Sequence, residues 1–348
     1  MFGAGLVHAR PCPELVKAYE RSCVELVNGG AVLRGKQMNK IEFGDCREIM
    51  REWAKQCLKA QTCVTSPPYF GLRDYGHDGQ IGLEETPEQY IQVMVEVFRS
   101  VRNVLADDGT VWLNIGDSYA SYRDGKATPD TTRGNNDGTL VPKGSARNRM
   151  ASTFNNSNVK HKDLIGIPWM LAFALRADGW YLRQDIIWHK PNPMPESVQD
   201  RCTKAHEYIF LLSKSSKYYF DNEAIKTPVK QDWGTRDRTN GKYHNEGSGL
   251  QPRGGLKKSY ETANKRSVWS VNTKSFKGAH FATYPPELIT PCVLAGSKEG
   301  DIVLDPFMGS GTTAMVAKQN GRHYLGCELN EEYKSLQDAR IAITGDLF

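Results

Sequence analysis

The chain alternates short apolar runs with longer segments in which apolar residues recur every three or four positions. The short runs predict strands at 40–46, 62–66, 110–117, 180–190, 301–307 and 322–329. The longer segments predict helices at 13–27, 47–58, 86–105, 167–179, 285–296 and 311–321. Thr86 is a suitable N-cap for the third of these helices, with Pro87 at its first position. Strand and helix in regular alternation predict an α/β fold with a mostly parallel sheet flanked by helices.

Two stretches interrupt this alternation. Residues 119–162 are rich in Gly, Asn, Ser and Thr and show little periodicity. They are too long for an ordinary connection, so they form either a mobile functional loop or a disordered segment. Residues 198–277 are less regular than their surroundings and follow a proline-rich stretch.

Composition is that of a soluble globular protein, with 348 residues, 39% hydrophobic and 24% charged. No apolar run approaches the ~20 residues that span a bilayer, and the first residues lack the features of a secretory signal. These observations predict a cytoplasmic protein without a membrane segment. The eight cysteines form no C-x-x-C pair, so a zinc site is not expected. We expect these cysteines to be small buried residues with free thiols.

The positive charge is concentrated in one segment. Net charge is +5, but residues 200–277 hold 16 Lys and Arg against 8 Asp and Glu, leaving the rest of the chain at −3. This segment favours a polyanionic partner such as nucleic acid, against the alternative of an ordinary solvated surface.

The first candidate site is "DPFMGSGTT" at 305–313, a glycine-rich turn between a predicted strand and a predicted helix. A phosphate loop needs lysine where Thr312 stands, and the dinucleotide pattern needs a third glycine that is missing. Asp305 and the helix start at Thr312 and Thr313 better suit a ligand with a positive centre and a carboxylate. Glu328, at the tip of the next strand, stands where an acid binds ribose hydroxyls. The alternative is a structural turn.

The second candidate site is "TSPPY" at 65–69. Neither proline has an N–H to donate, and no serine-hydrolase signature surrounds Ser66. The corner can present the Ser66 hydroxyl and the Pro67 carbonyl as acceptors, while Tyr69 supplies a flat face. Such a corner suits an amino group on a planar ring, against the alternative of a structural Pro-Pro turn.

Together the two motifs resemble the DNA amino-methyltransferases, which use S-adenosylmethionine to methylate the exocyclic nitrogen of cytosine or adenine. Ser66–Tyr69 matches the catalytic Asp/Asn/Ser-Pro-Pro-aromatic tetrapeptide of that family, and the late glycine turn resembles its β-type motif order. The similarity extends from about Ile41 to Tyr333. It implies a Rossmann-like methyltransferase fold with an inserted target-recognition region.

The resemblance also implies site residues. The catalytic residues would be Ser66, Pro67, Pro68 and Tyr69. The cofactor-binding residues would be Asp45, Cys46, Phe281, Asp305, Pro306, Phe307, Gly309, Ser310, Gly311, Thr312, Thr313, Glu328 and Leu329. Near Phe281 the chain departs from the family pattern, since Tyr284 and Pro285 replace its Gln and Lys. The candidates for phosphate contacts are Arg236, Arg238, Lys257, Lys258, Lys265 and Arg266, and no metal is expected.

On this basis the chain is expected to have four parts. These are a helical extension at 1–38, a catalytic half at 39–197 containing the 119–162 loop, a target-recognition region at 198–277 and a cofactor-binding half at 278–348. Duplex DNA is the implied partner. A homodimer and a companion restriction endonuclease are both compatible with the resemblance.

The identity of the target base rests on one residue. Family members with Ser at the first motif position are mostly cytosine-N4 enzymes, whereas Asp is typical of adenine-N6 enzymes. Ser66 therefore favours cytosine N4, with adenine N6 as the alternative because both side chains accept hydrogen bonds. Two more distant alternatives are an RNA methyltransferase and a non-catalytic DNA-binding module, and the motif order and the intact motifs argue against them.

Overall fold

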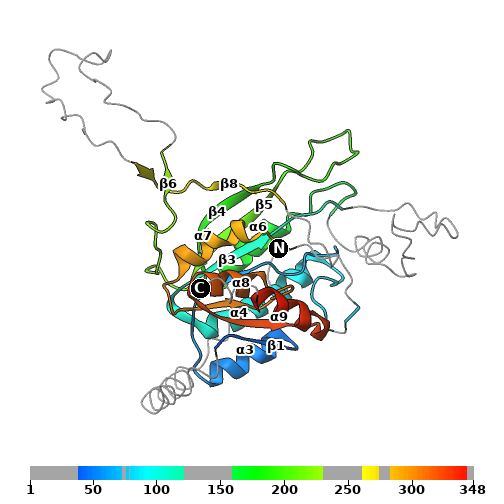
Figure 1. Cartoon of the computed structure of the whole chain (residues 1–348). Helices are drawn as coiled ribbons and strands as arrows, with labels where there is room; N and C mark the ends of the chain where they lie inside the picture. The colour runs from blue at the N-terminus through cyan, green and yellow to red at the C-terminus, as the bar shows by residue number, and fades with distance from the viewer. Residues whose placement is uncertain are drawn as a thin grey trace, which may run out of the picture.

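A computed structural model describes residues 38–72, 76–77, 79–120, 159–229, 261–273 and 283–342. Within these residues the centre is an eight-stranded sheet in the order β1-β10-β9-β2-β3-β5-β4-β8 (Figure 1). Its strands are β1 (Lys40–Phe43), β2 (Ala60–Thr65), β3 (Leu105–Ile115), β4 (Tyr181–His189), β5 (His206–Ser213), β8 (Val268–Ser270), β9 (Ile302–Asp305) and β10 (His323–Glu328). A separate two-stranded ladder pairs β6 (Thr227–Pro228) with β7 (Thr262–Ala263).

The sheet is mostly parallel. The β1–β10, β10–β9, β9–β2 and β2–β3 pairs are parallel, and so is β4–β8. Among the described strands of this sheet, only β5 is antiparallel to its two neighbours, β3 and β4. This arrangement confirms the predicted α/β class with a mostly parallel sheet.

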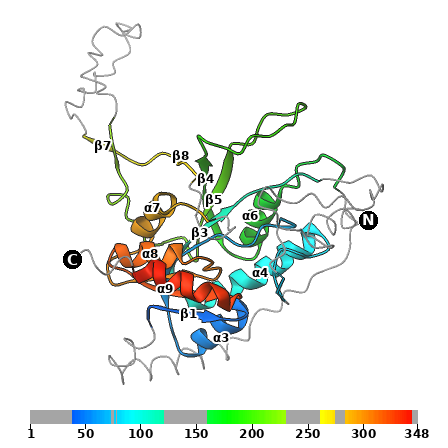
Figure 2. The same cartoon turned by 45° about the vertical axis from the view of Figure 1, so that its right-hand side comes forward.

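Helices cover both faces of the sheet, and Figure 2 shows the two layers on opposite sides. One layer holds α3 (Cys46–Lys55), α4 (Pro87–Val104) and α6 (Ile167–Ala177). The other holds α7 (Pro286–Gly296), α8 (Thr312–Gln319) and α9 (Lys334–Ala342), with the short 3-10 helix η3 (Glu331–Tyr333) before α9. Neighbouring strand residues alternate between the layers: Cys63 and Val111 pack against the first, whereas Val64 and Trp112 pack against the second.

Local signals explain several element boundaries. Thr86 caps α4 as predicted, because its hydroxyl accepts the N–H of Gln89 while the Gln89 side chain accepts the N–H of Thr86. Strand β3 begins at Leu105, immediately after α4, rather than at residue 110 as the pattern predicts, and its register against β2 shifts there.

Part of the predicted recognition region overlaps the main sheet. The predicted recognition region, 198–277, begins with chain that belongs to the main sheet, since β5 lies between β3 and β4 and β8 pairs with β4. The apolar run that forms β5 was obscured by the basic residues around it. The predicted helix at 13–27 and most of the 119–162 loop lie outside the described residues.

The sequence also predicts that the chain has no membrane segment and that its cysteines are buried. In the described part of the chain, no helix is both long and apolar enough to cross a membrane. Among the cysteines, Cys46, Cys63, Cys292 and Cys327 are buried as predicted, whereas Cys202 is exposed.

The connectivity reverses between β9 and β2. From β9 the chain passes through α8 to β10 on one side, while from β2 it passes through α4 to β3 on the other. Residues Thr62 and Cys63 pair directly with Val303 and Leu304. Ligands of open α/β sheets bind at such a reversal, beyond the carboxyl ends of the strands.

Candidate active site

A cavity of about 740 Å³ opens at this reversal, and both sequence motifs line it. Thirteen of the predicted site residues contribute to its wall: Asp45, Cys46, Ser66, Pro67, Pro68, Tyr69, Pro306, Phe307, Gly309, Ser310, Thr312, Glu328 and Leu329. Its volume is within the ~300–1,000 Å³ that is usual for small-molecule sites. The Pro-Pro corner and the glycine turn, far apart in sequence, therefore share one site.

The Pro-Pro corner follows directly from the end of β2 at Thr65. The hydroxyl of Tyr90 on α4 donates to the carbonyl of Pro68 at 2.9 Å, which ties the corner to the helix layer. The described residues place no donor on the carbonyl of Pro67, and that residue lines the cavity. The Ser66 side chain is half-buried at the same wall. Ser66 and Pro67, the two residues that the sequence offers as acceptors, therefore both line the cavity.

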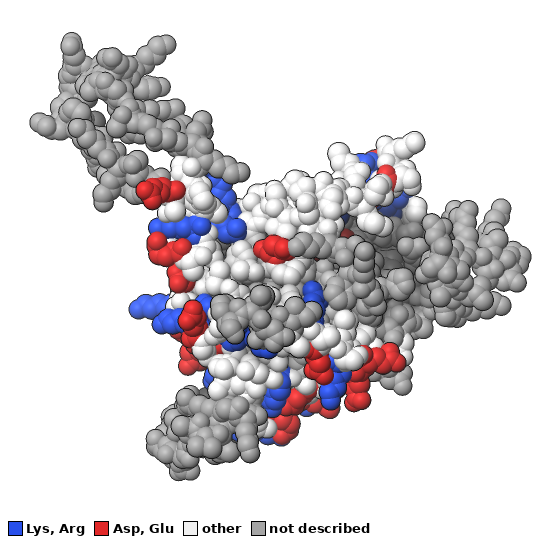
Figure 3. Space-filling view, in the orientation of Figure 1, with Lys and Arg blue, Asp and Glu red and all other residues white. Residues whose placement is uncertain are grey.

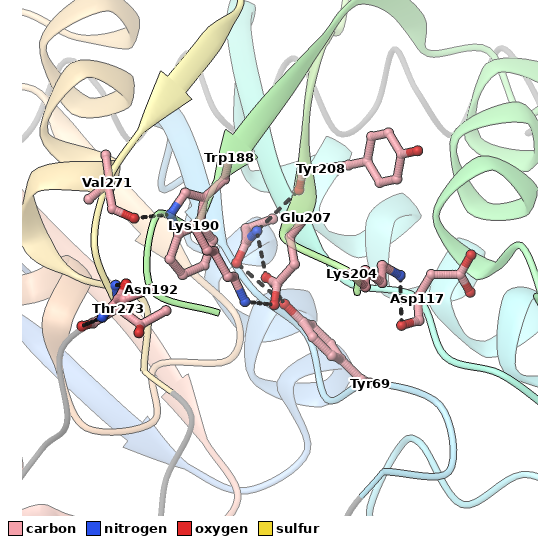
Figure 4. Close-up of polar contacts among 11 residues, drawn as sticks. Tyr69, Asp117, Trp188, Lys190, Asn192, Lys204, Glu207, Tyr208, Val271 and Thr273 are labelled. Atoms are coloured by element: carbon pink, nitrogen blue, oxygen red, sulfur yellow. Dashed lines mark hydrogen bonds and ion pairs between the residues drawn. The ribbon is translucent and has the colours of Figure 1, made fainter. Parts of the chain in front are cut away.

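Tyr69 is held by its hydroxyl group. The phenol donates to a carboxylate oxygen of Glu207 at 2.7 Å, and the side-chain oxygen of Asn114 lies 3.4 Å away (Figure 4). Burial raises the pKa of Tyr69 well above its ordinary value, and the charge of Glu207 raises it further. A hydrogen bond from Ser66 acts in the opposite direction. At neutral pH Tyr69 is therefore a neutral phenol with a fixed ring plane.

The glycine turn brings backbone close to the cavity. Gly309 and Gly311 have φ values of +52° and +82°, a region that favours glycine, and Gly311 is the N-cap of α8. Gly309 donates its N–H to Glu328 at 2.7 Å. The first turn of α8 begins at Thr312, which lines the cavity, and the first N–H groups of a helix have no partner within the helix. A ligand carboxylate fits this helix start.

Glu328 ends β10 at the floor of the cavity. One of its carboxylate oxygens accepts the N–H of Gly309 and the other accepts the N–H of Asn330 at 3.0 Å. Burial raises the pKa of Glu328, and these backbone hydrogen bonds lower it by a smaller amount. The two amides fix the orientation of the carboxylate, and each oxygen keeps capacity to accept a further hydrogen bond.

Asp45 lines the same end of the cavity but has a second role. Its carboxylate caps α3 by accepting the N–H of Arg47 at 2.8 Å, and it forms an ion pair with the Arg47 guanidinium at 2.6 Å. The hydrogen bond from the Arg47 side chain is the main reason that the pKa of Asp45 is lowered. Asp45 is thus an ionised acceptor whose position is set by its neighbour.

Three of the predicted cofactor residues do not line the cavity: Asp305, Gly311 and Thr313. Asp305 is completely buried and accepts hydrogen bonds from Thr65, Tyr284 and Thr313 and from the N–H of Phe307. The structure thus places Asp305 behind the cavity wall, whereas the sequence predicts that it faces the cation of a ligand. Its charge is used inside the protein, where it holds together the strands that carry the two motifs. Phe281 lies outside the described residues.

Sequence reasoning missed a polar group on the other side of Tyr69. Asn114 on β3, Lys190 after β4 and Glu207 on β5 all line the cavity, together with Trp188. The available signal was a charged residue next to an apolar strand, as in "IIWHK" and "HEYIF". This signal is common at strand ends, so it singled out neither Lys190 nor Glu207.

The predicted phosphate-binding residues are only partly described. Arg236, Arg238, Lys257 and Lys258 lie outside the described residues. Arg266 is exposed beside β8, and the ammonium of Lys265 stacks 4.9 Å from the ring centroid of Trp269, which is buried. Figure 3 shows Lys and Arg side chains, with acidic ones among them, where the chain leaves the body toward β6.

Comparison with known proteins finds similarity to DNA methyltransferases. The family model N6_N4_Mtase, described as DNA methylase, matches residues 60–338. The chain is 46% identical over 298 residues to the Type II methyltransferase M.Cfr9I of Citrobacter freundii, covering 86% of each chain. It is 47% identical over 302 residues to the Type II methyltransferase M.SmaI of Serratia marcescens, covering 87% of this chain and 90% of that one.

Solved structures share the fold. A putative DNA modification methylase from Thermus thermophilus, in complex with S-adenosyl-L-methionine, matches with a TM-score of 0.51 and 22% identity, over 88% of this chain and 96% of that chain. The PvuII DNA methyltransferase, described as cytosine-N4-specific, matches with a TM-score of 0.55 and 16% identity, over 86% of this chain and 85% of that chain.

Proposed function

This chain belongs to the DNA methylase family, and we propose that it transfers a methyl group from S-adenosylmethionine to the N4 amine of cytosine in duplex DNA. The observation that supports this proposal is the shared cavity, in which the Ser-Pro-Pro-Tyr corner faces the glycine turn. Membership in the family makes the chain a DNA methyltransferase. The choice of cytosine over adenine rests on Ser66.

The residues at the glycine-turn end fit the cofactor. The carboxylate of Glu328, oriented by two amides, suits the ribose hydroxyls, and the start of α8 suits the methionine carboxylate. Cys46, Phe307 and Leu329 supply apolar surface for a planar base. When bound there, S-adenosylmethionine supplies an electrophilic methyl group on a sulfonium.

The residues at the other end fit a target amine. Its lone pair is delocalised into the base, so it is a poor nucleophile. The Ser66 hydroxyl and the Pro67 carbonyl accept its two N–H bonds and direct the nitrogen toward the methyl group. Positioning and fixed dipoles then carry the reaction, without a covalent intermediate.

The target base must leave the duplex to reach this cavity, because its amine is paired inside the double helix. The flat face of Tyr69 supplies a surface on which the base can stack. Phosphate contacts from the basic segment, including Arg266, offset the few kcal/mol that unstacking costs. Since its relatives are named Type II methyltransferases, we propose that a restriction endonuclease accompanies this chain in its host.

The test is nucleoside mass spectrometry of plasmid DNA after incubation with the purified protein and S-adenosylmethionine. We expect N4-methylcytosine in the treated DNA and far less of it with the Ser66→Ala variant. N6-methyladenine without N4-methylcytosine would overturn the choice of base. Transfer to structured RNA but not to duplex DNA would overturn the choice of substrate.

A further inference from the structure

The loop between β4 and β5, residues 190–205, carries an exposed apolar side chain at the entrance of the cavity. Met194 is 85% exposed, more than any other large apolar residue in the described part of the chain. It also lines the cavity, together with Trp188 near the end of β4. A side chain that lines the cavity and is still exposed to solvent lies at its entrance. Figure 2 shows the loop projecting from the body of the molecule.

The backbone at Met194 is restricted on both sides. Met194 stands between Pro193 and Pro195 in the stretch "KPNPMPE". Each proline ring fixes its own φ, and Pro195 also limits the residue before it to extended conformations. Holding Met194 in one bound position therefore costs less conformational entropy than it would in an ordinary loop.

Side-chain contacts anchor the loop before and after Met194. The side chain of Asn192 donates to the carbonyl of Thr273 at 3.2 Å and accepts the N–H of Thr273 at 2.9 Å (Figure 4). On the other side, Arg201 forms an ion pair with Glu196 at 2.5 Å, and its guanidinium lies 3.8 Å from the ring centroid of Tyr119. Met194 is thus an exposed side chain on a loop that is held in place.

Duplex DNA with its target base in this cavity would place a gap in its base stack at the same entrance. The flipped nucleotide stays joined to the backbone on both sides, so the gap lies beside the opening through which the base enters. Apolar side chains of other proteins insert between base steps and kink the duplex. Methionine suits such a place, because its unbranched thioether adapts to irregular spaces and makes favourable contacts with aromatic rings.

We propose that Met194 enters the base stack of the duplex and occupies the space that the target base vacates. The inference rests on the proposed function, because it requires a base of duplex DNA in the cavity, and it holds for cytosine and adenine alike. Single exposed apolar residues are common on protein surfaces. What distinguishes Met194 is its place at the entrance of the cavity, together with its restricted backbone and the anchored loop.

The first test measures the rate of methyl transfer in a single turnover with Met194→Ala. The substrate is a short duplex containing the site that sequencing identifies in plasmid DNA methylated by the wild-type protein. On the fully paired duplex we expect the rate to fall about tenfold or more, because the variant no longer offsets the lost stacking. Met194→Leu, which keeps an apolar side chain of similar size, should retain most of the rate.

The matched control is Val198→Ala. It shortens an apolar side chain on the same loop, 40% exposed, that is not among the residues lining the cavity. This variant should methylate the paired duplex at the wild-type rate. A loss as large as that of Met194→Ala would show that the position at the entrance is not what matters, and would overturn the inference.

A mismatched duplex separates insertion from a structural role. A target base opposite a mismatched partner leaves the stack more easily, so Met194→Ala should come within about twofold of the wild-type rate on such a duplex. The fluorescence of 2-aminopurine at the target position, which rises when the base unstacks, should increase much less with Met194→Ala than with the wild-type protein. Equal losses of rate on paired and mismatched duplexes would overturn the inference.

The outcomes distinguish this inference from the proposed function. If the wild-type protein transfers no methyl group to duplex DNA, the proposed function fails and the inference fails with it. If it methylates the paired duplex and Met194→Ala does so at the same rate, only the inference is wrong. A loss of affinity for S-adenosylmethionine as large as the loss of rate would indicate a distorted cavity and would also overturn it.

Discussion

The hydroxyl of Thr65 lies 2.6 Å from a carboxylate oxygen of Asp305, although 240 residues separate them in sequence. Thr65 directly precedes the Ser-Pro-Pro-Tyr corner, and Asp305 begins the glycine turn. The bond therefore joins the last residues of β2 and β9, the two strands from which the catalytic and cofactor ends of the cavity extend. Any change in this contact should affect both ends.

Replacing Asp305 by Asn tests this connection. The carboxylate accepts from three hydroxyls and one N–H, whereas an amide offers a single acceptor oxygen and adds donors. We expect the free energy of unfolding to fall by about 1–3 kcal/mol, with lower kcat and weaker cofactor binding. Urea unfolding and calorimetric titration measure these effects. Thr65→Ser, which keeps the hydroxyl, should remain close to wild type, and a large loss there would contradict the argument.

Cofactor binding should depend on pH through Glu328. Burial raises the pKa of this carboxyl above its ordinary value, so it takes up a proton at higher pH than an exposed glutamate. Only the ionised form accepts from ribose hydroxyls on both oxygens. We expect the affinity for S-adenosylmethionine to be constant above this pKa and to decline as pH falls through it.

Glu328→Gln provides the control for that dependence. Its affinity should be lower by about tenfold and should lack the acid decline, as measured by calorimetry across a pH series. The effect of Glu328 on folding stability changes with pH in the opposite direction to its effect on cofactor affinity. Because the folded pKa is raised, the contribution of Glu328 to stability is present in acid and is lost as pH rises through the folded pKa. A wild-type pH profile in Glu328→Gln would exclude this residue as its source.

Much of the site could be predicted because its residues lie in short, specific motifs. The strand before Ser66, the turn at Gly309 and the acid at Glu328 each have a local signature, and the alternation of elements places them at one edge of a parallel sheet. What local patterns do not contain is the direction of a buried side chain. Asp305 has the sequence context of a ligand-binding acid, yet its carboxylate points into the protein.

The group around Glu207 was missed for a related reason. Lys190 follows β4 and Glu207 lies on β5, and the pairing of these antiparallel strands depends on the placement of β5 beside β3. The sequence pattern assigned that segment to the recognition region, so it gave no reason to bring either residue near Tyr69. Contacts of this kind follow from strand order, which is not a local property of the chain.

Substitutions in the catalytic corner should lower the rate of methyl transfer without weakening cofactor binding. Ser66→Ala removes an acceptor for the amine, and we expect kcat to fall about 10²- to 10³-fold. Tyr69→Phe keeps the ring but cannot donate to Glu207, so it should lower kcat while leaving base stacking intact. Both variants should bind S-adenosylmethionine nearly as wild type does. Full activity in both would refute the catalytic assignment, and methyl incorporation from labelled cofactor measures it.

Arg266 should contribute to DNA affinity without contributing to sequence choice. The residue is exposed beside β8, and a phosphate contact releases about one counterion. We expect Arg266→Ala to weaken binding of every duplex to a similar extent and to reduce the slope of log K against log salt by about 1. Lys55→Ala, on the exposed face of α3, should leave the slope unchanged. A change confined to one DNA sequence would point instead to base recognition.

Gly116 sets the space available to Tyr69. A Cβ at this position, just after β3, would lie 2.7 Å from Cε2 of the Tyr69 ring and 3.4 Å from Cδ of Glu207. The ring cannot easily move away, because its hydroxyl is bound to Glu207. We therefore expect Gly116→Ala to displace the ring, to break that hydrogen bond and to lower kcat by about tenfold or more, with cofactor affinity retained. Since the glycine turn lies at the other end of the cavity, weaker cofactor binding without a loss of kcat would show that the residue acts differently.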